Sequence, residues 1–211
     1  WKRHAGFDVV CDVGTQVAKD IPHSLNAVPE MMIRKNRTNA NSWVVYHKDL
    51  PVSSGGDLGF MYLNSTSAAD TTSLFWTKAP TSTYFSVGTD IDINQNNKNI
   101  ITMLFASVNN SDGDPISKVG SYTGNGSTGQ TITLGFQPRF VIIRKYNDAA
   151  HWLVLDTTRG WGSGDDKYLL LNSNGAQGNY EVGAPVSNGF TLVGDNDYNN
   201  SSGTYIYYAH A

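Results

Sequence analysis

The sequence is poor in the residues that mark several common protein classes. Its one cysteine, Cys11, cannot form an intrachain disulfide, which excludes a disulfide-stapled secreted scaffold. Charged residues make up only 16% of the 211 residues, which disfavours a helical bundle rich in Glu and Lys. No apolar run approaches the roughly 18 residues that a membrane span needs, and no signal peptide is visible. Because the chain starts at Trp1 rather than Met, we expect a fragment or a processed product.

The chain also lacks a run of basic residues, and its net charge is −3. The densest basic cluster, Arg34–Arg37, is better explained as a strand end than as a phosphate-binding groove. These features argue against nucleic acid as a partner. Hydrophobic residues reach 39%, which argues against disorder. Cys11 lies in an apolar run with Val9 and Val10, so we expect it to be a buried small hydrophobic residue.

What the sequence does contain is an internal repeat. Residues 29–43 match residues 138–152 without a gap, at an offset of 109 (138 − 29). Further matches follow in the same order, from Gly14 with Gly124 (offset 124 − 14 = 110) to Ala106 with Ala209 (offset 209 − 106 = 103). Loops tolerate insertions and paired strands do not, so the matched blocks are predicted strands. The chain is therefore predicted to be two tandem copies of one module of roughly 100 residues.

Each copy has the pattern of short antiparallel strands. The candidate segments are β-branched and aromatic, and Gly, Asn, Asp and Ser bound them. No stretch with helical period is longer than about two turns. The predicted strands are 9–13, 16–21, 31–37, 43–47, 60–64, 84–87 and 100–106, then 118–122, 130–134, 140–146, 152–156, 168–172, 190–193 and 204–209. The predicted fold class is all-β, an antiparallel, jelly-roll-like β-sandwich in two tandem repeats.

The junction between the copies is polar and rich in turn residues. We assign residues 1–110 to the first repeat, 111–115 to a short linker and 116–211 to the second repeat. Whether the two repeats share one core stays open.

The ordered set of motifs resembles a repeated domain found in marine tailed phages, especially cyanophages. The segments that carry the resemblance are WKRHAGFDVV (1–10), VPEMM (28–32), APTST (79–83), MLFAS (103–107), SYTGNG (121–126), GFQPRF (135–140) and TYIYYAHA (204–211). The resemblance spans essentially the full length. It implies a virion component, a tail fibre or related appendage, made in the host cytoplasm. It transfers no catalytic residue and no ligand.

The sequence offers little for catalysis or metal binding. No histidines have a metal-ligand spacing, and no nucleophile elbow is present. His47 and Asp156 occupy equivalent positions, and surface strand ends explain them better than a catalytic pair. Asp and Asn residues occupy every second position in one segment of each copy, a pattern that resembles the first half of a calcium loop. Ordinary turns explain this pattern better. The candidate ligands are Asp90, Asp92, Asn94, Asp195, Asp197 and Asn199. We therefore expect no enzyme activity and no cofactor.

Three aromatic residues are candidates for stacking on a sugar. Trp76 and Trp161 lie in Ser-, Thr- and Gly-rich segments, and Tyr198 lies in a turn rich in Asp and Asn. Aromatic faces beside amides and carboxylates suit sugar binding, although a lone loop aromatic more often packs locally.

The leading interpretation is thus a non-enzymatic virion module that presents loops to a host-surface glycan. Two alternatives stay open: a capsid or tail decoration protein that binds only other virion subunits, and a carbohydrate-active enzyme. A homotrimer is a further option for a fibre, although no coiled-coil heptads are present.

Overall fold

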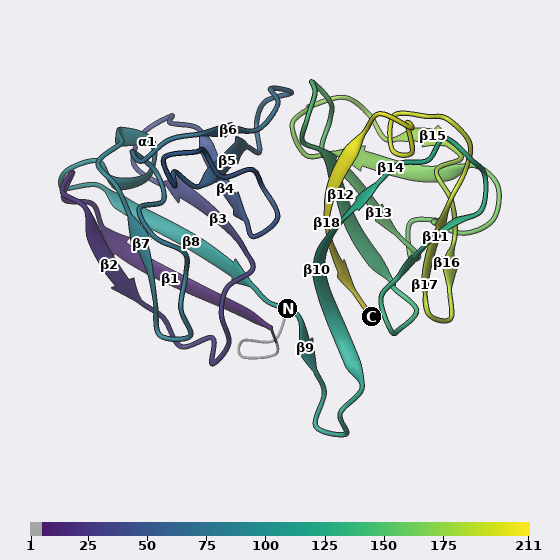
Figure 1. The fold of residues 1–211 in the computed structure, drawn as a ribbon, viewed down its shortest axis with the longest axis horizontal. Coiled ribbons are helices and arrows are strands. Elements are labelled where there is room, and N and C mark those ends of the chain that lie inside the picture. Colours follow the sequence, from purple (N-terminus) through teal and green to yellow (C-terminus); the bar gives the residue numbers. More distant parts are fainter. Residues whose placement is uncertain (1–5) are drawn as a thin grey trace. The chain divides into compact units, whose positions relative to one another are not determined.

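The computed structural model describes residues 6–211, and antiparallel strands make up nearly all of its regular structure (Figure 1). The helix α1 (Ile91–Asn94) is a single turn, which Asp90 caps. Among these residues, no helix is long and apolar enough to cross a membrane. The chain separates into two compact units, Trp1–Asn64 with Ala69–Ala106, and Ser65–Ala68 with Ser107–Ala211. The prediction of an all-β, sandwich-like fold in two halves is confirmed.

The first unit contains a six-stranded sheet and a two-stranded sheet. The large sheet has the order β1 (Phe7–Val13), β8 (Asn99–Phe105), β3 (Met31–Asn36), β4 (Trp43–His47), β5 (Gly59–Tyr62) and β6 (Asp70–Thr71). The small sheet pairs β2 (Lys19–Pro22) with β7 (Tyr84–Val87). Arg34 of β3 lies over the Phe85 ring of β7, 5.7 Å from its centroid, so the small sheet covers this face of the large one.

The second unit has the same plan. Its seven-stranded sheet has the order β15 (Gly178–Tyr180), β14 (Asp166–Leu170), β13 (Leu153–Asp156), β12 (Phe140–Lys145), β18 (Thr204–His210), β10 (Pro115–Thr123) and β9 (Val108–Asn109). A second sheet joins β11 (Gln130–Thr133), β17 (Gly189–Leu192) and β16 (Pro185–Val186). The core lies between these sheets and includes Val141, Ile143, Leu155 and Phe190. Residues 111–115, the predicted linker, reach from the turn after β9 to the first residue of β10.

The register of the strands shows that the two copies are equivalent. Met31 pairs with His47 in the first unit, as Phe140 pairs with Asp156 in the second, which reproduces the offset of 109 (140 − 31). The last predicted match is wrong. Met31 also pairs with Phe105, and its equivalent Phe140 pairs with His210. Phe105 is therefore equivalent to His210, and Ala106 is not equivalent to Ala209.

Two side chains differ from their expected environments. Cys11 is exposed, not buried as expected, and the strand that carries it, β1, lies at the edge of its sheet. His47 is only 1% exposed, so it is not a surface residue; its Nδ1 accepts a hydrogen bond from the Asp49 N–H.

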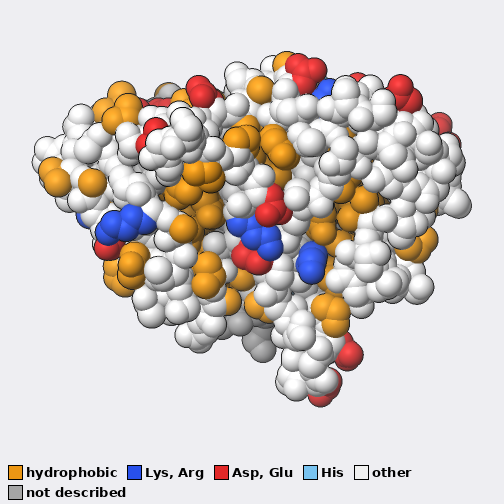
Figure 2. All heavy atoms as spheres, viewed as in Figure 1, with side chains coloured by type: hydrophobic (Ala, Val, Ile, Leu, Met, Phe, Trp, Pro, Cys, Tyr) orange, Lys and Arg blue, Asp and Glu red, His pale blue; other side chains and the backbone are white. Residues whose placement is uncertain are grey.

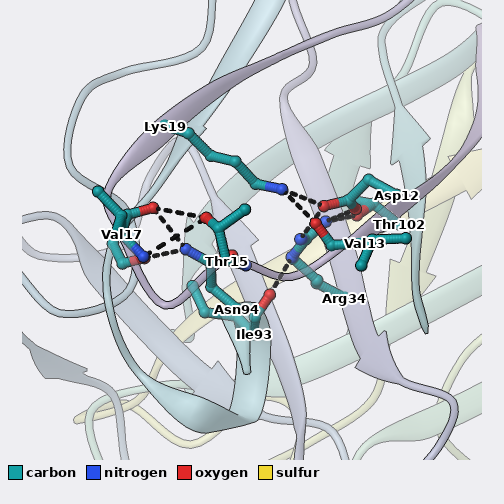
Figure 3. A network of polar contacts seen from close by, with 10 residues as sticks. Asp12, Val13, Thr15, Val17, Lys19, Arg34, Ile93, Asn94 and Thr102 are labelled. Carbon is teal, nitrogen blue, oxygen red and sulfur yellow. Dashed lines mark hydrogen bonds and ion pairs between the residues drawn. The ribbon is translucent and has the colours of Figure 1, made fainter. Parts of the chain in front are cut away.

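A buried ion pair ties β1 to β3 in the first unit (Figure 3). Arg34 is fully buried, and its Nη1 and Nη2 donate to the two carboxylate oxygens of Asp12, at 2.8 and 3.0 Å. Its Nε donates to the Ile93 carbonyl, and Nη1 also donates to the Thr102 hydroxyl. Lys19 Nζ lies 3.0 Å from the same carboxylate. Burial acts to raise the pKa of Asp12, but Arg34 and Lys19 outweigh it and hold the pKa below its usual value.

Candidate functional site

Two loops of the second unit meet at one end of its large sheet. β12 runs antiparallel to both β13 and β18, so the turn after β12 and the loop before β18 lie side by side. Asn147 joins them, because its amide donates to the Ser202 carbonyl and its oxygen accepts from the Thr204 N–H, both at 2.9 Å. Loops carried at the end of a rigid sheet are where binding groups are most often placed.

A buried asparagine fixes the loop before β18. Asn199 has no solvent exposure; its side-chain oxygen accepts from the Asn125 N–H at 3.1 Å, and its amide donates to the Ser127 carbonyl at 2.9 Å. The Gly126 N–H donates to the Asn199 carbonyl at 2.8 Å. We call this arrangement the asparagine clamp.

The first unit has the same clamp, built on Asn94 (Figure 3). Asn94 is also fully buried, accepts from the Thr15 N–H at 3.0 Å and donates to the Val17 carbonyl at 2.8 Å. The Gln16 N–H donates to its carbonyl, and Gln16 has the positive φ (55°) that Gly126 has in the second unit (68°). The clamp is thus a repeated structural device.

The clamp and its neighbours account for the calcium-like pattern. Asn94 and Asn199 use their amides on backbone groups, as described above. Asp90 accepts from the Asp92 N–H as a helix cap, and Asp195 accepts from the Asn200 amide at 3.0 Å. Within residues 6–211, no cluster of three or more His, Cys, Asp or Glu residues is placed to hold a metal ion. Asn94, Asn199, Asp90 and Asp195 thus bond backbone or amide groups.

A hollow of the second unit lies between the two loops. It has a volume of about 510 Å³, within the range of ligand pockets. Its lining is Thr66, Lys145, 148–151, 195–197 and Asn200. We call it the charged hollow, because three aspartates (148, 195 and 197) and one lysine line it.

A second hollow adjoins the first across Asn196 and Asp197, which line both. It has a volume of about 370 Å³, and its other lining residues are Tyr168, Asn179, Tyr180 and Tyr198. Tyr180, on the edge strand β15, is 47% exposed. Burial raises the pKa of the Tyr198 phenol. We call this the tyrosine hollow.

Of the three aromatic candidates, the structure places Tyr198 at a hollow and the two tryptophans elsewhere. Trp76 and Trp161 are 1% and 3% exposed, and Trp161 donates its indole N–H to the Gly183 carbonyl at 2.8 Å. Local packing is therefore the correct interpretation for both tryptophans. Tyr168 and Tyr180, which line the same hollow as Tyr198, were missed by sequence reasoning.

On the face that Figure 2 shows, Lys and Arg side chains occur in small groups, and some of these groups lie beside Asp or Glu side chains.

Residues 2–211 match one family model, described as a domain of unknown function, DUF7483. The chain belongs to this family. No curated protein and no solved structure matches the chain. The match spans both units, so one DUF7483 domain comprises the two repeats together.

The two repeats of this DUF7483 domain differ at the place where the charged hollow lies. In the first repeat, the Asn36 and Asn39 amides both donate to Gln95 Oε1 at 2.8 Å, and the Asn41 amide donates to Asp92 at 3.1 Å. These bonds join the two loops directly.

In the second repeat, the equivalent side chains form no such bonds. Asn36, Asn39 and Asn41 correspond, at the offset of 109, to Lys145, Asp148 and Ala150. Lys145 instead lies 3.4 Å from Asp148, and Ala150 has no amide to reach Asp197. The loops that side chains close in the first repeat thus enclose a hollow in the second.

Proposed function

We propose that this DUF7483 domain is a non-enzymatic module of a phage virion, a tail fibre or appendage, and that its second repeat binds a host-surface glycan. The virion setting rests on the resemblance of the sequence motifs to the repeated domain of marine tailed phages. The binding role rests on the loop end of the second repeat.

The observation that carries the binding role is the tyrosine hollow. Sugar rings present C–H groups on one face and hydroxyls around their rim, so they are bound by aromatic faces beside amides and carboxylates. Tyr180 offers a half-exposed ring, and Asn179, Asn196 and Asp197 offer amide and carboxylate groups at the same hollow.

A binding role fits the charged hollow better than hydrolysis does. A glycosidase needs one carboxyl group whose raised pKa lets it act as an acid. The pKa of Asp148 is instead lowered, by a hydrogen bond from the Ala149 N–H and by Lys145. The hollow therefore supports a carboxylate that accepts hydrogen bonds from hydroxyls.

The experiment is a binding assay of the full chain on an array of bacterial surface polysaccharides. Tyr180→Ala is expected to weaken binding roughly tenfold and to leave the thermal midpoint unchanged, because the ring is half-exposed. Leu171→Ala is the matched control, since Leu171 is 42% exposed in the same unit and lies outside both hollows.

Three results would count against the proposal. Binding that Tyr180→Ala leaves intact would remove the tyrosine hollow from the site. Binding to virion proteins with none to any polysaccharide would favour the decoration protein. Release of reducing sugar from a bound polysaccharide would show an enzyme.

A further inference from the structure

We infer that the ligand of this site is a non-acidic oligosaccharide of at least two sugar units, which spans the tyrosine hollow and the charged hollow. This inference rests on the proposed function, and it adds the length and the charge of the glycan.

The length follows from the shared wall of the hollows. Asn196 and Asp197 line both, so a chain bound in the tyrosine hollow meets the charged hollow at its next unit. The backbone that carries them is fixed: the Asn196 amide donates to the Val193 carbonyl at 2.7 Å, and the asparagine clamp holds Asn199. Two adjoining rigid hollows favour a ligand that fills both, because little ordering of the protein is needed.

The charge follows from the lining of the charged hollow. Three carboxylates, those of Asp148, Asp195 and Asp197, line it together with the ammonium group of Lys145 and the imidazole of His151. Lys145 lies 3.4 Å from Asp148, and its side chain is 14% exposed, so its charge is compensated locally. A uronic or other acidic sugar would meet like charges there, which costs binding free energy and excludes wrong partners. Neutral and amine-bearing sugars meet acceptors for their O–H and N–H groups.

The first repeat supports the idea that the hollow is a binding feature rather than a gap in packing. Its equivalent loops are joined by amide hydrogen bonds from Asn36, Asn39 and Asn41, so the same backbone plan can be closed by side chains. The second repeat has Lys, Asp and Ala at those positions and keeps the opening.

The test uses the polysaccharide array, scored by the charge of the repeating unit, followed by fragments of the strongest binder. We expect the strongest binders to be neutral or amine-bearing and the acidic ones to bind at least tenfold more weakly. A fragment of two or more units is expected to compete at least tenfold better than its single sugar.

One variant is designed to close the charged hollow at Asp197, which it shares with the tyrosine hollow. Ala150→Asn restores the amide that bonds an aspartate in the first repeat, so the oligomer is expected to bind no better than the single sugar. Ala150→Ser is the control, because its side chain is small and cannot reach as far. Thermal midpoints of both variants check that they fold.

The outcomes separate this inference from the proposed function. An acidic polysaccharide as the strongest binder, or a single sugar that competes as well as the oligomer, overturns the inference and leaves glycan binding intact. Unchanged oligomer binding by a folded Ala150→Asn variant also overturns it. No binding to any polysaccharide overturns the proposed function itself.

Discussion

Replacing Arg34 by Met is expected to destabilise the first unit strongly, whereas the same change at Arg144 is expected to cost little. Both arginines are fully buried, and each lies over an aromatic ring: Arg34 is 5.7 Å from the centroid of Phe85, and Arg144 is 5.8 Å from that of Trp152. They differ in their polar partners: Arg34 bonds the carboxylate of Asp12, and Arg144 bonds two backbone carbonyls.

The expected magnitudes follow from these partners. Arg34→Met removes the buried partner of Asp12 and four hydrogen bonds, and breaking a buried pair from one side costs about 3–5 kcal/mol. Arg144 has no acidic partner; its Nη2 donates to the Thr66 and Ser67 carbonyls, and its buried Nε and Nη1 lack hydrogen-bond partners. Burial lowers its pKa to about 10. Arg144→Met removes two buried nitrogens that have no hydrogen-bond partner, so the free energy of unfolding is expected to change by about 1 kcal/mol or less, in either direction.

The assay is urea unfolding of the full chain, with hydrogen exchange of β3 and β12 peptides to assign each change to its unit. Arg34→Met is expected to lower the midpoint of the first unit. Asp12→Asn in that background is expected to recover part of the loss, because it removes a half-buried carboxylate that keeps only Lys19 as its ion-pair partner. Equal losses for Arg34→Met and Arg144→Met would refute the reasoning. So would a loss below about 1 kcal/mol for Arg34→Met.

Three further predictions concern the same units. Because the pKa of Asp12 is lower in the folded than in the unfolded chain, its contribution to stability is present above about pH 4 and is lost as the pH falls through the folded pKa. If the urea midpoint of Asp12→Asn fell with pH as much as that of the unsubstituted chain, this would be contradicted. Asn199→Ala leaves buried backbone groups without partners and is expected to cost about 2–4 kcal/mol by urea unfolding, more than Asn200→Ala. Trp161→Ala is expected to cost about 3–5 kcal/mol by the same measurement, because a 3% exposed ring leaves a cavity.

Much of the fold could be predicted because the strands carry their own pattern. All fourteen predicted strands have a counterpart, and 43–47 and 84–87 match β4 and β7 residue for residue. The missed strands β6, β9, β15 and β16 have two or three residues each, too few for a period-2 alternation to show. Cys11 shows the other limit: an apolar run predicts a strand but not whether that strand lies at an edge.

The candidate site could be predicted only in part. The duplicated Asp and Asn pattern pointed to the correct loop, but Asn199 is a clamp rather than a ligand, which depends on backbone groups more than 70 positions away in sequence. Tyr168 and Tyr180 come from different strands, and only the pairing of β14 with β15 brings them together. The sequence does point to the site where equivalent positions of the two repeats differ: Asn41 corresponds to Ala150, and Ile93 corresponds to Tyr198.

The clamp has a consequence for engineering. It holds its loop through the carboxamide and the carbonyl of Asn199, and the side chain of Asp197 takes no part in these bonds. A combinatorial library that varies position 197 therefore keeps the clamp, provided that Asn199 and Gly126 are preserved, and it also keeps the bonds of Asn200 to Asp195 and Ser202. The domain thus offers a cysteine-poor scaffold for selecting new recognition specificities.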